Sequence, residues 1–221
     1  MKEKRSYRMS ARAEAAGQTR ARIVSAARER FLDAPYDDVT LAGIAADAGV
    51  STQTVLNQFG TKEDLFLAFA AEFIPEIDAL RATARPGDVR AVVRVVLRQY
   101  ELMGDLNVRA LELEHRLPAL AEISHTGRIN HQAWLEQIFA DELPTGRAAR
   151  RTTVHALYAA TDVYLWKVLR RDLRASLAET TRVMERLVRG ALVDSVTTAT
   201  SPDHGETDRR TGQNHQKGTP P

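Results

Sequence analysis

The sequence predicts an all-α protein in which an N-terminal three-helix bundle with a helix-turn-helix is joined to a larger helical body. Three observations support this fold class. Apolar residues recur every three or four positions along most of the chain, which is the period of a helix. No segment shows the strict alternation of a strand, and no internal repeat is present. Glycines and prolines interrupt the helical pattern at intervals typical of turns between helices.

Composition excludes several classes of protein. The chain of 221 residues has no cysteine, so disulfides, thiolate metal sites and cysteine nucleophiles are excluded. No apolar run approaches the roughly 20 residues that span a bilayer. The N-terminus also lacks the apolar core of a secretory signal. We therefore expect a cytoplasmic protein with no membrane partner.

Charge is unevenly distributed along the chain. The net charge is +2, but residues 1–32 hold nine Lys or Arg against three Glu, a net charge of +6 for this segment. A basic end suits a polyanionic partner such as nucleic acid. A solubilising arm without a partner has the same composition, so charge alone leaves both interpretations open.

The first helix is predicted from Thr19. Ile23, Ala27 and Phe31 recur every four residues on one face, which is the apolar face of an amphipathic helix. Pro35 cannot continue a helix, so the helix ends before it.

Capping residues and glycines predict the next three helices. Thr40 can cap a second helix through its hydroxyl. Gly49 then allows a tight turn at positive φ, and Ser51 can cap a short third helix. Gly60 ends this helix, and a fourth runs over residues 61–74, where the following proline bends it or ends it.

The rest of the chain reads as a helical body with a polar tail. The predicted helices are one from Val89 to Met103 capped by Asp88 after a linker at 83–87, one at 108–117, a long segment from Pro118, and two at 146–170 and 175–196. We expect four regions: a flexible basic arm at 1–17, a helix-turn-helix domain at 18–74, a ligand-binding and dimerisation domain at 75–196, and a disordered polar tail at 197–221.

Residues 40–59, TLAGIAADAGVSTQTVLNQF, have the spacing of a helix-turn-helix motif. Ala45 is small where two helices must pack closely, and Gly49 lies in the turn. In such motifs the N-terminal part of the second helix faces the base edges in the major groove of DNA. Amide side chains such as Gln53 and Asn57 can bind adenine there. The alternative is a helical hairpin whose polar residues are only solvated, but the flanking residues favour the motif.

The flanking residues carry a family resemblance. They are Arg22, Ile23, Val24, Ala26, Ala27, Phe31, Thr40, Ile44, Ala45, Ala48, Gly49, Val50, Ser51, Thr54, Val55, Phe59, Lys62, Glu63 and Leu65. In this register, residues 18–70 resemble the TetR family of bacterial transcriptional regulators. The resemblance implies a DNA-binding domain followed by a helical body that differs between members.

The resemblance also implies roles for single residues. Thr52, Gln53 and Asn57 would face bases or the nearby backbone. Two positions depart from the family pattern: Leu56 stands where a tyrosine is common, and Gln53 where a small residue or proline is common. The operator sequence therefore cannot be inferred from the operators of other family members. The expected DNA-binding residues are Arg20, Thr40, Ser51, Thr52, Gln53, Thr54, Asn57, Gln58 and Lys62, with Thr40, Thr54 and Lys62 on phosphates.

Between residues 154 and 169, apolar or small side chains occupy nearly every side of the predicted helix. A helix that is apolar all round must be covered all round. This predicts a homodimer that uses this helix and the last one; the alternative is the central helix of a monomer. The expected interface residues are Ala160, Tyr164, Met184, Leu187, Val188 and Ala191.

Aromatic residues of the body could line a mostly apolar cavity with a few polar groups, as in small-molecule sites. The alternative is that they belong to the core. The expected pocket residues are Tyr100, Trp134, His155, Tyr158 and Trp166.

Taken together, these patterns predict a homodimeric, sequence-specific DNA-binding transcriptional regulator. It would be a repressor that a small-molecule effector releases from a palindromic double-stranded operator. No catalytic activity or cofactor is expected, because the sequence has no HExxH, P-loop, GxSxG or GxGxxG motif and no nucleophile with an evident base. No metal is expected either, because the pairs Glu112–His115 and Glu122–His125 lie too close along the chain to face each other from two helices. The alternative is a helical enzyme or interaction module with a vestigial helix-turn-helix, and activation in place of repression also stays open.

Overall fold

The computed structural model describes residues 2–198, with side chains for residues 13–118 and 120–193. Within these residues it is entirely helical, with no strand, which confirms the predicted fold class. The elements are α1 (Lys2–Asp33), η1 (Tyr36–Asp38), α2 (Leu41–Asp47), α3 (Thr52–Phe59), α4 (Lys62–Arg81), α5 (Val89–Leu113), α6 (Pro118–Ile138), α7 (Arg147–Ala160), α8 (Val163–Lys167), the π-helical turn η2 (Val168–Asp172) and α9 (Leu177–Thr198).

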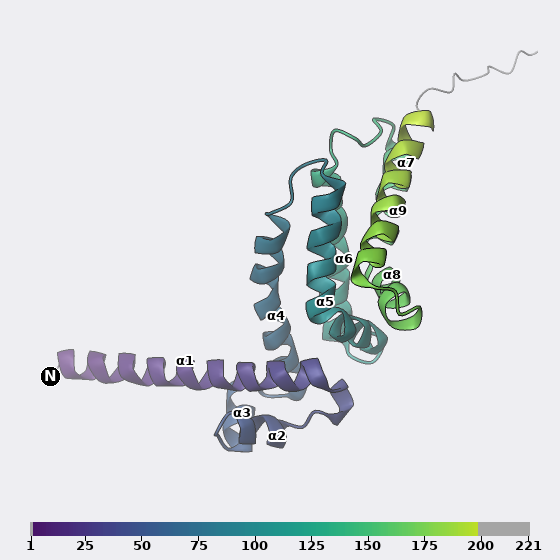
Figure 1. Cartoon of the computed structure of the whole chain (residues 1–221). Coiled ribbons are helices and arrows are strands. Elements are labelled where there is room, and N and C mark those ends of the chain that lie inside the picture. Colours follow the sequence, from purple (N-terminus) through teal and green to yellow (C-terminus); the bar gives the residue numbers. More distant parts are fainter. Residues whose placement is uncertain (1, 199–221) are drawn as a thin grey trace, which may run out of the picture.

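Two groups of helices make up the described part of the chain (Figure 1). Helix α1 lies across one end with α2 and α3 on its far side, and α4 leads from there to the upright helices α5, α6, α7 and α9. We call α1, α2, α3 and the start of α4 the head, and α5 to α9 the body. Each part has its own apolar core, and the head core also takes in Met103, Leu106 and Leu120 from the body. The head is therefore packed onto the body through apolar contacts.

Hydroxyl and carboxylate caps begin the helices where the sequence predicts them. Thr40 Oγ1 accepts a hydrogen bond from the Gly43 amide at 3.1 Å, at the start of α2. Ser51 caps α3 in the same way, and Asp88 caps α5. Such caps satisfy backbone donors that have no partner inside the helix, and each contributes about 1 kcal/mol to stability.

Three helices extend further than predicted. Helix α1 begins at Lys2, so the segment expected to be a flexible arm is helical from there and continuous with the first helix. Helix α4 continues through Pro75 to Arg81 and crosses the predicted boundary at residue 74. Pro75 is exposed, and Phe73 and Ile77 on either side still bury against the rest of the protein, so tertiary packing offsets the hydrogen bond that proline removes. Helix α5 runs unbroken to Leu113 and absorbs the start of the predicted helix at 108–117.

The predicted helix at 146–170 is wrong, because the chain breaks at Thr161. The Thr161 hydroxyl donates back to the Leu157 carbonyl at 2.8 Å, and Asp162 starts a new helix by accepting from the Tyr164 amide. Side chains that bond to nearby backbone compete with helix continuation in this way. The buried apolar residues of 154–169 therefore face the core from three elements, α7, α8 and η2, rather than encircling one helix. The predicted tail lies outside the described residues from position 199 onward.

Candidate nucleic-acid interface and body cavity

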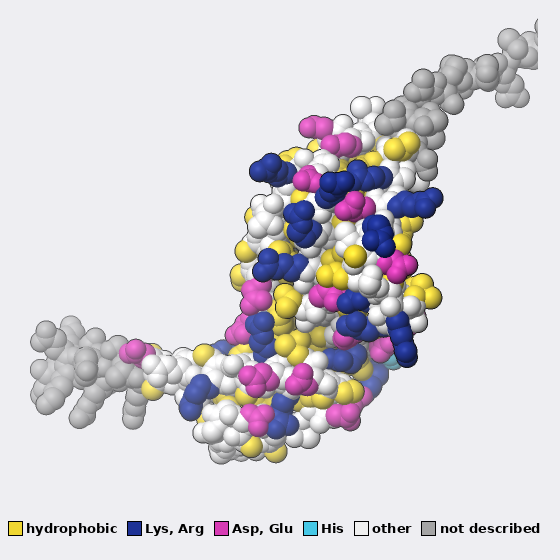
Figure 2. All heavy atoms as spheres, viewed as in Figure 1, with side chains coloured by type: hydrophobic (Ala, Val, Ile, Leu, Met, Phe, Trp, Pro, Cys, Tyr) yellow, Lys and Arg dark blue, Asp and Glu magenta, His cyan; other side chains and the backbone are white. Residues whose placement is uncertain are grey.

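Helix α3 presents a polar face to solvent. Val55 and Phe59 anchor it in the head core, with exposed fractions of 0% and 8%. Thr52, Gln53 and Asn57 point the other way and are exposed. The Gln53 Nε2 donates to Asn57 Oδ1 at 2.9 Å, so the two amides lie side by side, one helical turn apart. Figure 2 shows this end of the molecule, over α2 and α3, as mostly white, with few Lys, Arg, Asp or Glu side chains.

The turn between α2 and α3 has the geometry that the motif requires. Gly49 has φ of 65°, a conformation that costs other residues energy because of their Cβ. The Val50 amide then bonds to the Ala45 carbonyl at 2.9 Å and closes the turn. Ile44 and Ala45, both buried, hold α2 against α3. The packing of α2 against α3 and the turn at Gly49 are thus as predicted.

Both hydroxyls expected on phosphates are engaged within the head: that of Thr40 caps α2, and that of Thr54 bonds to Ser51, the cap of α3. Ser51 Oγ accepts from the Thr54 amide at 3.1 Å and lies 2.8 Å from the Thr54 hydroxyl. Thr40 is engaged at the start of α2. Both helices therefore present ordered N-termini, where free amides attract phosphate.

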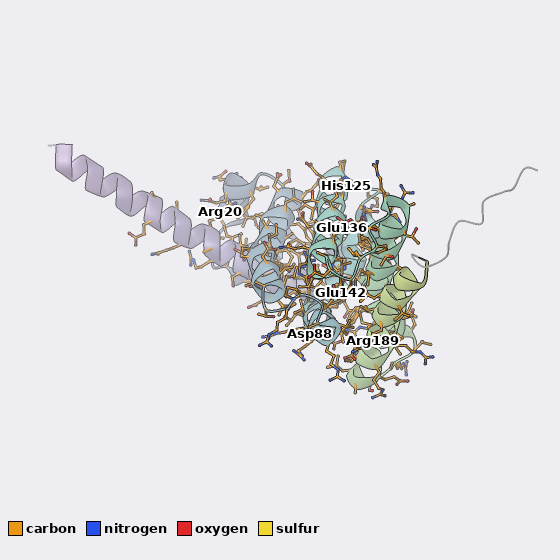
Figure 3. All side chains as sticks on the ribbon, turned by 90° about the horizontal axis from the view of Figure 1, so that it is seen from above. Arg20, Asp88, His125, Glu136, Glu142 and Arg189 are labelled. Atoms are coloured by element: carbon orange, nitrogen blue, oxygen red, sulfur yellow. The ribbon has the colours of Figure 1, made fainter. Side chains whose placement is uncertain are left out.

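The two basic residues expected to bind DNA, Arg20 and Lys62, have different surroundings. Arg20 lies over the Phe59 ring at 4.2 Å and donates to the Gln58 carbonyl at 3.2 Å, so it borders the end of α3 and is exposed. Figure 3, seen from above, shows Arg20 on the opposite side of the molecule from Arg189 of α9. Lys62 is half-buried, and its ammonium donates to the carbonyls of Tyr36 and Val39 at 2.9 and 3.0 Å. Two of its three donors thus serve the α1–α2 loop instead of pointing to a ligand.

A cavity of about 800 Å³ lies between α4, α5, α6 and the α7–α8 region. Its walls are mainly apolar, which is the usual character of a small-molecule site. Apolar side chains from three helices form much of its surface: Phe66, Phe73, Met103, Leu106 and Leu120. Helix α4 therefore connects the cavity directly to the head, because its first turns pack under α1.

Only two of the five predicted pocket residues line this cavity. Tyr100 and Tyr158 do, and burial raises the pKa of Tyr158 to about 12, which keeps the phenol neutral. Trp166 is wrong: it is fully buried, fills the space over Gly104 and donates to Glu101 Oε1 at 2.8 Å. His155 is also wrong, because it is exposed on the outer side of α7. Trp134 packs against the body core, outside the cavity lining.

A hydrogen-bonded chain that the sequence did not single out runs along one cavity wall. Arg81 Nη2 lies 3.2 Å from His131 Nδ1, and His131 Nε2 lies 2.8 Å from the Thr161 hydroxyl. Burial, together with the charge of Arg81, lowers the pKa of His131 to about 3, so the imidazole is neutral. Ile74, Ile77 and Arg81 are spaced to lie on one helix face and could have indicated this wall from the sequence. That inference requires the helix to continue past Pro75, where the sequence predicts a bend or an end.

The predicted interface residues divide into two groups. Ala160, Met184 and Val188 are at most 5% exposed and belong to the core of the same chain, so no partner could reach them; these predictions are wrong. Ala160 packs into the body core from the end of α7, and Met184 and Val188 pack into it from the inner face of α9. Tyr164 and Leu187 remain exposed, at 49% and 44%, and Ala191 is half-buried.

The described residues lack two further features. They contain no group of three or more His, Cys, Asp or Glu residues arranged to hold a metal ion. Among the described helices, none is long and apolar enough to cross a membrane.

These features define a helix-turn-helix DNA-binding protein with a helical body. Residues 23–69 match the family described as bacterial regulatory proteins, tetR family. Residues 23–69 thus match the DNA-binding domain of that family, and the described part of the chain shares the fold of solved transcriptional regulators.

Solved structures support the fold over most of the chain. A transcriptional regulator from Rhodococcus sp. Rha1 has a TM-score of 0.61 and 17% identity, covering 81% of this chain and 96% of its own. NalD of Pseudomonas aeruginosa, the secondary repressor of the MexAB-OprM multidrug efflux pump, has a TM-score of 0.56 and 23% identity, covering 80% and 96%. A Mesorhizobium loti MAFF303099 protein assigned to the TetR family has a TM-score of 0.56 and 18% identity, covering 83% of this chain and 97% of its own. No curated protein matches the sequence.

Proposed function

We propose that this protein is a homodimeric, cytoplasmic repressor that binds a palindromic operator through α3 and leaves it when a small molecule occupies the body cavity. The observation that carries the proposal is the exposed, uncharged polar face of α3 on a rigid helix-turn-helix. Gln53 and Asn57 are the base readers, since amides at this position can bind adenine through two hydrogen bonds. Thr52 lies beside them at the N-terminal end of the helix.

A dimer is needed to read a palindrome, and α7 and α9 offer the surface for it. These two helices pack side by side in one chain. Leu187 and Gly190 are exposed on α9, next to half-buried Ala191, and Thr152 and Ala156 are exposed one turn apart on α7. Small and apolar side chains at this spacing suit close packing of four helices around a two-fold axis. Such a dimer would set two heads for successive major grooves, about 34–36 Å apart.

The dimer is tested by Leu187→Glu, which would bury a charge in the interface. We expect sedimentation equilibrium to give a monomer for this variant and a dimer for the unchanged protein. The matched control is Ile129→Glu, because Ile129 is 52% exposed on α6, outside the proposed surface. A dimer that persists in Leu187→Glu would exclude α9 from the interface.

Release follows from the position of α4. Phe66 and Phe73 belong to the head core and also line the cavity. Arg109 of α5 donates to the carbonyl of Leu32 at 2.8 Å, and Arg116 pairs with Asp37 at 2.9 Å, so the head is tied to the body at two more points. A ligand that favours one position of α4 would thus change the head spacing, by as much as its affinity for the two states differs.

The DNA-binding proposal is tested by selecting sequences from random DNA and measuring binding to the selected site and to the DNA upstream of the gene. We expect Gln53→Ala combined with Asn57→Ala to abolish selectivity, at about 1–3 kcal/mol for each lost base contact. The control is Gln137→Ala, an exposed glutamine on α6. Selectivity retained in the double variant would remove these residues as readers, and failure to select any sequence would favour the enzyme or interaction module.

A further inference from the structure

Arg81 lies at the end of α4, in the wall of the body cavity, without a carboxylate partner. Its guanidinium is half-buried and lies over the Trp134 ring at 5.2 Å. Among the described residues, its hydrogen-bond partner is His131. It forms no salt bridge with any residue that the structure describes, although ten such pairs occur elsewhere in that part of the chain.

The direction of the hydrogen-bonded chain shows that His131 holds Arg81 without neutralising it. The Thr161 hydroxyl donates its hydrogen to the Leu157 carbonyl at 2.8 Å, so it accepts from His131 Nε2. The imidazole therefore carries its hydrogen on Nε2, and its Nδ1 accepts from Arg81. An arginine keeps its charge at neutral pH, so a full positive charge remains beside an apolar cavity.

The other charged groups of the cavity are differently placed. Asp162 is committed to the Tyr164 amide at 2.8 Å, and Arg128 pairs with Glu114 at 3.0 Å. Asp78 and Glu122 are exposed at the rim, where water solvates them. Arg81 is thus the one cavity-lining charge in the described residues that is half-buried and lacks both an ion pair and a capping role. Removing a charge from water without a partner is costly, so a ligand anion would be favoured here.

We propose that the cavity binds an amphipathic organic acid, with its carboxylate on Arg81 and its apolar part among Phe66, Phe73 and Met103. The fork of the guanidinium matches a carboxylate through two parallel hydrogen bonds. The inference deepens the proposed function, because it names the chemical class of the effector for the same cavity. The cavity of about 800 Å³ has room for an acid with an aromatic or branched body.

The test compares three probes with the same phenylbutyl body by isothermal titration calorimetry. They are 4-phenylbutyrate, the neutral 4-phenylbutyramide and the cationic 4-phenylbutylamine. We expect the full-length protein to bind the acid at least about tenfold more tightly than the amide, because charge-assisted hydrogen bonds are the stronger ones. Arg81→Gln should bind acid and amide equally, while Arg81→Lys keeps a preference for the acid. Arg85→Gln is the matched control, since Arg85 is exposed in the α4–α5 loop, outside the cavity lining.

Each outcome decides the proposal. Equal binding of acid and amide by the unchanged protein, tighter binding of the amine, or no binding of the acid at millimolar concentration would overturn it. A preference for the acid that survives Arg81→Gln in a protein with unchanged circular dichroism would assign the anion to another group and overturn it as well.

A separate assay distinguishes this proposal from the proposed function. The acid is added to the complex with the selected operator DNA. Binding that depends on Arg81 but leaves the complex intact supports the ligand class and contradicts release by that ligand. Such binding in a protein that selects no DNA sequence supports the ligand class and contradicts the regulator itself.

Discussion

Replacing Lys62 with methionine separates two roles for this residue. The family resemblance implies that Lys62 holds a DNA phosphate, whereas its ammonium donates to the carbonyls of Tyr36 and Val39 and lies 4.1 Å from the centre of the Tyr36 ring. These contacts fix the loop that leads to Thr40, the cap of α2. We therefore expect Lys62→Met to destabilise the protein.

The magnitude follows from the contacts that are lost. Hydrogen bonds to a charged group contribute about 1.5–3 kcal/mol each when they are buried, and the contact with the aromatic ring adds about 0.5–1 kcal/mol. Because Lys62 is only half-buried, water can reach the freed carbonyls and offset part of the loss. We expect a net loss of about 2 kcal/mol. For a protein of this size, this lowers the midpoint of thermal unfolding by about 4–8 °C.

The assays are thermal unfolding and the salt dependence of DNA binding. Lys167→Met is the control, because Lys167 forms an exposed ion pair with Asp172, and such pairs contribute little. DNA affinity should fall in Lys62→Met, but the slope of log affinity against log salt should stay the same, since no phosphate contact is lost. The reasoning is refuted if the unfolding midpoint is unchanged while the slope falls by about 0.9, the value for one phosphate contact.

Two further predictions concern packing and pH. In Gly104→Ala the new Cβ would lie 2.5 Å from Cζ3 of the fully buried Trp166 ring, so we expect the free energy of unfolding, measured by urea denaturation, to fall by about 1–3 kcal/mol. Gly17→Ala is the control: its new Cβ meets nothing within 4 Å, and the free energy of unfolding should rise by up to about 1 kcal/mol. An unchanged stability in Gly104→Ala would mean that the Trp166 ring can move. Since the pKa of His131 is lowered to about 3, the unfolded chain binds a proton below pH 6.5 that the folded one does not, and stability is lost as pH falls from about 6.5 toward 3. His131→Gln should reduce the pH slope of the unfolding free energy between pH 6 and 4, by at most about 1.4 kcal/mol per pH unit; equal slopes in the variant and the unchanged protein would contradict the buried, neutral imidazole.

Local signals were sufficient for the head. Thr40 and Ser51 cap their helices through their own hydroxyls, and Gly49 takes the positive φ that the turn needs. Each of these features depends on residues within a few positions along the chain. The polar face of α3 is visible for the same reason, because a helix with Val55 and Phe59 on its inner side must turn its polar residues outward.

The body could not be read in the same way. Thr161 ends α7 because its hydroxyl bonds back to Leu157 and its position suits a buried hydrogen-bond chain that begins on α4. Pro75 fails to end α4 because Phe73 before it and Ile77 after it pack against the head core. In both places contacts between distant segments outweigh local preference, which is a weak guide wherever tertiary packing is strong.

The sequence by itself thus determined the fold class, the helix-turn-helix and the exposed polar face of α3, because periodicity, caps and glycines act locally. Only the tertiary structure decided which side chains surround the cavity and which are core. In the tertiary structure Trp166 lies in the core, Lys62 donates to loop carbonyls, and Arg81 lies beside His131, fifty positions away along the chain. The physical reason is that burial and charge pairing depend on which helices meet in space, and no spacing along the chain encodes those meetings directly.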